Sequence, residues 1–80
     1  MEQRISFIGI VIENRQAAPE INQILSEHAN IIIGRMGLPH QRNQKISIIS
    51  LIVDATTDQL NSLTSQLNNV EYVTVKNAQT

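Results

Sequence analysis

Residues 45–54 read KISIISLIVD, and together with residues 3–13, QRISFIGIVIE, they decide the fold. Both stretches are rich in β-branched residues, which favour strands. Successive side chains of a strand point to opposite faces of its sheet. Both faces are apolar in each stretch, with Ile5, Phe7 and Val11 against Ile8, Ile10 and Ile12 in the first and Ile46, Ile48 and Ile52 against Ile49, Leu51 and Val53 in the second. Such strands are expected in the middle of a sheet that is covered on both sides.

A helix is expected after the first of these strands, over residues 17–29. Ile21, Ile24 and Leu25 recur there at helical spacing, which indicates one apolar face. Pro19 falls in the first turn, where its missing N–H has no hydrogen-bond partner to lose. The first strand and this helix thus form the opening βα unit of the chain.

The middle of the chain continues with two strands and a second helix. Residues 30–39, NIIIGRMGLP, predict a strand that runs through a polar hairpin loop at 40–44 into the strand at 45–54. Residues 56–59, TTDQ, have the Thr-x-x-Gln spacing of a capping box, which opens a helix. The two asparagines at 68–69 are expected to end that helix.

In residues 70–77, VEYVTVKN, alternate side chains fall on opposite faces, with residues 70, 72, 74 and 76 against 71, 73, 75 and 77, which predicts a half-buried last strand. The residues after it are expected to fray. The order strand, helix, strand, strand, helix, strand is typical of a ferredoxin-like βαββαβ sandwich. We therefore expect a single α+β domain over residues 1–80, with two helices on one face of a four-stranded antiparallel sheet. The first and third strands occupy the middle of such a sheet.

The composition narrows the classes of function. A chain of 80 residues holds one domain whose core is only marginally stable without help. The chain has no cysteine, so disulfides cannot stabilise this core, and a cytoplasmic location is favoured. A net charge of -1 without a basic stripe argues against direct nucleic-acid binding. No apolar run approaches the roughly 20 residues that span a bilayer, and no signal peptide opens the chain, so no membrane role is expected.

Two helices cover only one face of the sheet, which leaves an apolar face open in a single copy. Burying five or six of its side chains offers on the order of 10 kcal/mol, comparable with an estimated cost of about 4–15 kcal/mol for association. A homo-oligomer, either a dimer or a tetramer, is therefore expected, and a modest exposed patch is the alternative. Arg35 alternates with Ile31 and Ile33, so it either points into the interface or lies at the sheet edge. The residues expected at the interface are Ile5, Phe7, Val11, Arg35, Ile49 and Leu51.

Four residues are candidates for binding a small ligand. Asn14, Arg15 and Gln16 follow the first strand, where exposed N–H groups and an arginine can hold a carboxylate or phosphate. The alternative is that Asn14 caps the helix and Arg15 is solvated. His40 lies in the hairpin loop, where binding residues are common, although a solvated loop explains it equally well. His28 lies late in the first helix, where a cation is favourable without any function.

No catalytic, metal or cofactor site is expected. The acidic residues fall on separate elements, and no serine or histidine stands with them in a nucleophile pattern. His28 and His40 are the only histidines, which is too few nitrogen or sulfur ligands for a nickel or zinc site. A small enzyme on a ferredoxin-like scaffold is therefore the weakest of the alternatives.

Three features carry a resemblance to a known family: residues 11–15, VIENR, at the end of the first strand, Gly37-Leu38-Pro39 at the end of the second, and residues 45–76. In these features and their order the chain is similar, along nearly its whole length, to the iron-only hydrogenase system regulators. That resemblance implies a protomer like ACT-like regulatory domains and the effector-binding half of nickel-responsive regulators, which assembles through its sheets and senses a small ligand. The chain departs from ACT domains in having no glycine soon after the first strand.

The expected function is a non-enzymatic regulatory module, a homo-oligomer that binds a small effector or a partner protein. The transcriptional role that the resemblance implies would need a partner, because no residues are left over for a DNA-binding segment. A structural scaffold that assembles through its sheet without a small ligand is the alternative.

Overall fold

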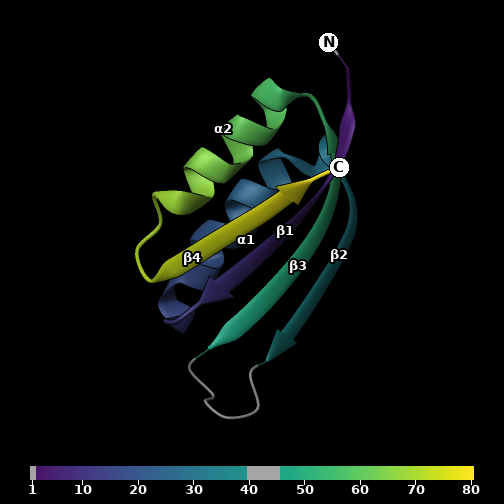
Figure 1. The fold of residues 1–80 in the computed structure, drawn as a ribbon. Coiled ribbons are helices and arrows are strands. Elements are labelled where there is room, and N and C mark those ends of the chain that lie inside the picture. The colour runs from purple at the N-terminus through teal and green to yellow at the C-terminus, as the bar shows by residue number, and fades with distance from the viewer. Residues whose placement is uncertain (1, 40–45) are drawn as a thin grey trace.

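The computed structural model describes residues 2–39 and 46–80 and confirms the ferredoxin-like α+β fold. The four strands form one antiparallel sheet in the order β2-β3-β1-β4, and the two helices lie together on one side of it (Figure 1). The predicted hairpin loop at 40–44, with His40, lies outside the described residues. The elements are β1 (Arg4–Ile12), η1 (Arg15–Ala17), α1 (Ala18–Glu27), η2 (Ala29–Ile31), β2 (Ile32–Pro39), β3 (Ser47–Ala55), α2 (Thr57–Asn68) and β4 (Val73–Gln79).

The central strands divide their side chains between a buried face and an open one. On the side that faces the helices, Ile8, Ile10 and Ile12 of β1 are no more than 1% exposed. Leu51 and Ile49, the β3 partners of Ile8 and Ile10 on the same face, are also buried. The core also takes in apolar residues from both helices and the connections, namely Ala17, Ile21, Ile24, Leu25, Ile31, Leu60, Leu63, Leu67 and Val70.

The predicted helix signals are present at both helix starts. Pro19 occupies the first turn of α1. The Thr56 hydroxyl accepts a hydrogen bond from the Gln59 backbone N–H at 3.2 Å, and the Gln59 side-chain oxygen accepts one from the Thr56 N–H at 2.9 Å. This reciprocal pair is the predicted capping box, and it fixes where α2 begins.

The starts of two strands and the end of the chain depart most from the sequence prediction. The segment expected to open the second strand begins as a 3-10 turn, Ala29–Ile31, and β2 starts only at Ile32. The last strand starts at Val73 instead of residue 70, because Val70 turns into the core. The expected fraying at the end is wrong for this structure, since the Thr80 N–H and hydroxyl both donate to the Ile5 carbonyl oxygen at 3.0 Å.

Among the residues that the structure describes, the core contains one polar side chain without a partner. Ser6 of β1 is fully buried on the helix side of the sheet, and its hydroxyl has no hydrogen-bond partner. An unpaired buried hydroxyl is a local cost, because it has lost its water and gained no replacement. Among the described residues, neither helix is long and apolar enough to cross a membrane.

Candidate functional site

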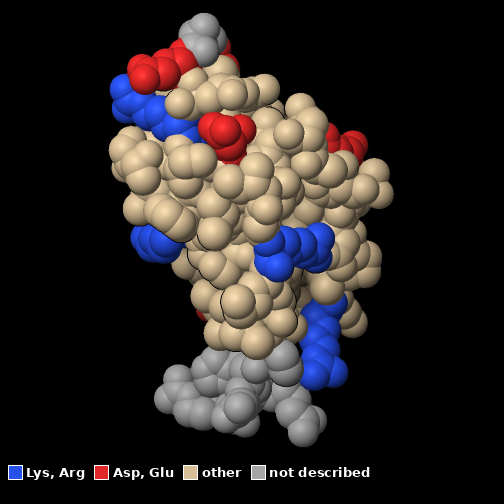
Figure 2. All heavy atoms as spheres, turned by 90° about the vertical axis from the view of Figure 1, so that its right-hand side faces the viewer, with Lys and Arg blue, Asp and Glu red and all other residues tan. Residues whose placement is uncertain are grey.

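The face of the sheet turned away from the helices, here called the open sheet face, is largely apolar and exposed. Phe7 of β1 is 49% exposed, Ile52 of β3 is 37% exposed, and Met36 and Leu38 of β2 are more than half exposed. From the side on which β2 lies in Figure 1, most of the surface is uncharged, and the charged side chains form a few separate groups (Figure 2). By register and burial the face comprises Ile5, Phe7, Gly9 and Val11 of β1, Ile48, Ser50, Ile52 and Asp54 of β3, Gly34, Met36 and Leu38 of β2, and Thr74, Lys76 and Ala78 of β4.

Three of the expected interface residues lie on the open sheet face and three do not. Ile5, Phe7 and Val11 are on it, as the alternation of the first strand predicted. The prediction is wrong for two residues of β3, since Leu51 is fully buried and Ile49 is 7% exposed beneath the helices. Both faces of β3 are apolar, so its alternation alone cannot tell which residues the helices cover.

Arg35 is the third residue that lies elsewhere. A register irregularity between Ile32 and Gly34 breaks the predicted alternation of β2. Arg35 therefore pairs with the core residue Leu51 and shares its helix side of the sheet. There its guanidinium donates a hydrogen bond to the Asn22 side-chain oxygen of α1 at 2.5 Å, so it is an exposed residue at the sheet edge.

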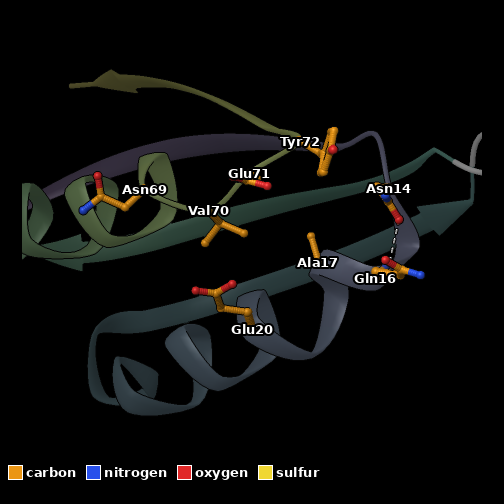
Figure 3. A pocket seen from close by; sticks show the side chains of 8 residues that line it. All are labelled: Asn14, Gln16, Ala17, Glu20, Asn69, Val70, Glu71 and Tyr72. Carbon is orange, nitrogen blue, oxygen red and sulfur yellow. Dashed lines mark hydrogen bonds between the residues drawn. The ribbon is translucent and has the colours of Figure 1, made fainter.

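A second candidate site is a hollow of about 280 Å³ at the end of the sheet where β1 leads into α1. Side chains from the η1–α1 segment and from the α2–β4 connection surround it (Figure 3). Two carboxylates, Glu20 and Glu71, lie among its lining residues with no basic side chain. The lining, here called the end hollow, consists of Asn14, Gln16, Ala17, Glu20, Asn69, Val70, Glu71 and Tyr72.

Tyr72, which lines the end hollow, has an unusual backbone conformation. Its φ of 65° is the one positive value among the described non-glycine residues. The Tyr72 carbonyl oxygen accepts a hydrogen bond from the Glu13 N–H at 2.7 Å, which ties the start of β4 to the end of β1. Backbone in this left-handed region costs free energy for a residue with a side chain, so the surrounding contacts must hold it there.

The structure brings together two of the four predicted ligand-binding residues. Asn14 and Gln16 both line the end hollow, and the Asn14 side-chain oxygen accepts a hydrogen bond from the Gln16 N–H at 2.9 Å (Figure 3). Asn14 is thus also the cap of the first helical turn. Arg15 is exposed and is not part of the lining, and His40 lies outside the described residues.

His28 has a structural role at the end of α1. Its Nδ1–H donates to the Ile24 carbonyl oxygen at 2.8 Å, one of the carbonyls left free at a helix end. Within residues 2–39 and 46–80, no group of three or more His, Cys, Asp or Glu side chains is placed to hold a metal ion.

Sequence reasoning missed most of the residues that line the end hollow. Glu20 comes from α1, whereas Asn69, Glu71 and Tyr72 come from a connection about fifty residues later. No short motif in the sequence indicates that residues so far apart line the same site. The fold topology could have predicted it, because β4 pairs antiparallel with β1, which places the start of β4 next to the end of β1.

Comparison with known proteins gives one family match and several structural likenesses. The family model TM1266-like, described as "Iron-only hydrogenase system regulator, putative", matches residues 4–77. The structure of the uncharacterized protein TM1266 from Thermotoga maritima is similar with a TM-score of 0.92 and 28% identity, covering 98% of each chain. No curated protein matches the sequence.

Two more distant structures share the fold alone. The C-terminal domain of the MgtC protein from Mycobacterium tuberculosis has a TM-score of 0.75 at 10% identity, over 98% of this chain and 88% of that one. CutA1 from Oryza sativa has a TM-score of 0.57 at 18% identity, over 96% of this chain and 80% of that one.

Proposed function

The chain belongs to the TM1266-like family of iron-only hydrogenase system regulators, and from that membership we infer that it is a non-enzymatic regulatory module acting as a homo-oligomer. A regulator needs a surface that recognises another molecule. The single observation that carries the proposal is the open sheet face, where Phe7 and Ile52 stand exposed side by side at the centre. We assign this face to contact between copies of the chain.

The size of the open sheet face suits such an interface. Four strands of seven to nine residues measure about 19 by 26 Å, which is roughly 500 Å² for each copy. Two copies packed face to face would bury about 1,000 Å², the lower limit for a specific interface. The many apolar side chains supply the free energy that association requires.

The end hollow is the proposed site for a small effector. Its volume of about 280 Å³ suits a small molecule. The amides of Asn14 and Gln16 offer hydrogen bonds, and the carboxylates of Glu20 and Glu71 favour a ligand with a positively charged group. An effector bound between the start of α1 and the start of β4 would contact the segments that flank the end of β1.

Control of transcription, in this proposal, runs through a partner protein in the cytoplasm. The six Lys and Arg residues are dispersed and the net charge is -1, which favours contact with a protein over contact with DNA. A chain without cysteine suits a reducing compartment.

The second candidate function is a scaffold that assembles through the same face and binds no small ligand. The open sheet face supports it equally, so the end hollow distinguishes the two. A thermal-shift screen of small amines and amino acids, run on the native chain and on Glu71→Gln, decides between them. A compound that raises the melting temperature of the native chain and not of the variant supports the regulator, and a screen with no such compound favours the scaffold.

A charge placed on the open sheet face tests the assembly. Phe7→Asp would bury carboxylates between the two sheets, so we expect the variant to run as a single copy in light scattering after gel filtration. Ser65→Asp adds the same charge on the exposed surface of α2 and should leave the native mass unchanged. Equal masses for Phe7→Asp and the native chain would refute the assignment of this face.

A further inference from the structure

Gly9 lies in the middle of the central strand β1, where nothing among the described residues requires a glycine. Its φ is not positive, and a Cβ built on it would have the Lys76 carbonyl oxygen at 4.0 Å as its nearest neighbour. Glycine inside a strand lowers stability, since it loses more chain entropy on folding and packs no side chain. Space kept clear above Gly9 therefore points to something outside the chain that approaches the open sheet face.

The neighbours of Gly9 extend this clear space into a pattern of large and small side chains. Reading across the sheet from β2 to β4, the row that contains Gly9 is Met36, Ser50, Gly9 and Lys76. The adjacent row on the same face is Gly34, Ile52, Phe7 and Ala78. At each of the four strands, one row has a large side chain where the other has a small one.

We propose that a second copy of this chain packs on the open sheet face about a two-fold axis that runs across the strands between these two rows. Such an axis lies parallel to both sheets and exchanges the rows, so each row of one copy meets the other row of its partner. Phe7 then sits over Gly9 of the second copy, and Ile52 over its Ser50. At the edges, Met36 of one copy lies over Gly34 of the second copy, and Lys76 lies over its Ala78.

This arrangement explains the glycine and the exposure of Phe7 together. The two rows are about 7 Å apart along the strands, and packed sheets lie about 10 Å apart, so large side chains must enter spaces left by small ones. All four pairs flank the axis, and the central pairs overlap most, since the twist of each sheet separates the edges. A self-complementary face is what a two-fold interface between identical chains requires.

The register of this dimer rests on the proposed function, and a steric test separates the two. Gly9→Phe fills the clear space, and its Cβ is accommodated in a single copy with no described neighbour closer than 4.0 Å. The matched control is Gly37→Phe, whose Cβ would meet nothing within 4 Å and which pairs with Ile49 on the helix side of β2. Circular dichroism and thermal melts establish that each variant folds. If Gly9→Phe does not fold, Gly9→Ala replaces it as the test variant.

Sedimentation equilibrium then gives the dimer dissociation constant of each chain. We expect Gly9→Phe to weaken the dimer at least tenfold and Gly37→Phe to leave it unchanged. The swap Phe7→Gly with Gly9→Phe exchanges large and small and should restore association above that of Gly9→Phe alone. A dimer that tolerates Gly9→Phe, or a swap no tighter than the single variant, overturns this register, whereas a native chain that is monomeric overturns the proposed assembly as well.

Discussion

Phe7 of β1 and Ile52 of β3 lie directly opposite each other in the antiparallel pair and are both exposed on the open sheet face. Their chain neighbours Ile8 and Leu51 are also paired, and both are buried beneath the helices. Adjacent residues of the same two strands therefore have different environments. One pair holds the single copy together, and the other is available to a partner.

Alanine substitutions at neighbouring positions of β3 should separate folding from association. Leu51→Ala removes a fully buried side chain and should lower the free energy of unfolding by about 2–5 kcal/mol. Ile52→Ala removes a side chain that contributes less to the single copy, so it should weaken self-association and reduce the stability of a dissociated chain much less. Urea unfolding at low protein concentration and sedimentation at high concentration measure the two effects. Equal losses of stability in both variants would contradict the assignment of the two faces.

The capping box of α2 should contribute measurably to stability. Thr56→Ala removes the hydroxyl that accepts the Gln59 N–H, and we expect a loss of about 1 kcal/mol in the free energy of unfolding. Thr57→Ala is the control, because Thr57 is exposed in the first turn and is not the capping residue. Thermal or urea unfolding compares them, and a larger loss for Thr57→Ala would show that the box does not define the start of this helix.

The unpaired hydroxyl of Ser6 leads to a prediction of the opposite sign. Ser6→Ala removes a buried oxygen atom that has no hydrogen-bond partner and leaves the rest of the side chain in place. Since the hydroxyl gains nothing in the folded state, we expect the variant to be as stable as the native chain or more stable. A drop of more than about 1 kcal/mol in the free energy of unfolding would indicate that the hydroxyl has a partner in solution.

The fold could be predicted from the sequence because its signals are local. The β-branched runs, the helical spacing of Ile21, Ile24 and Leu25, and the Thr56–Gln59 box each specify their own element. Their order then leaves few topologies. The register irregularity in β2 was not visible in this way, and it moved Arg35 to the helix side of the sheet.

The two faces of the sheet could not be told apart by the same means. Ser50 between Ile48 and Ile52 marks the exposed face of β3 correctly. The corresponding polar residue of β1, Ser6, lies instead in the core. The position of a serine therefore does not identify the exposed face in both central strands. The end hollow was only partly predicted, because the pairing of β4 with β1 brings Glu71 into the same lining as Gln16.

Sedimentation of the native chain over a range of concentrations tests most directly whether the open sheet face is covered by a second copy. The proposed assembly predicts a species of at least twice the 9.0 kDa chain mass that dissociates on dilution. A single 9.0 kDa species at concentrations up to about 1 mM, where even a weak association of about 4 kcal/mol is visible, would contradict it.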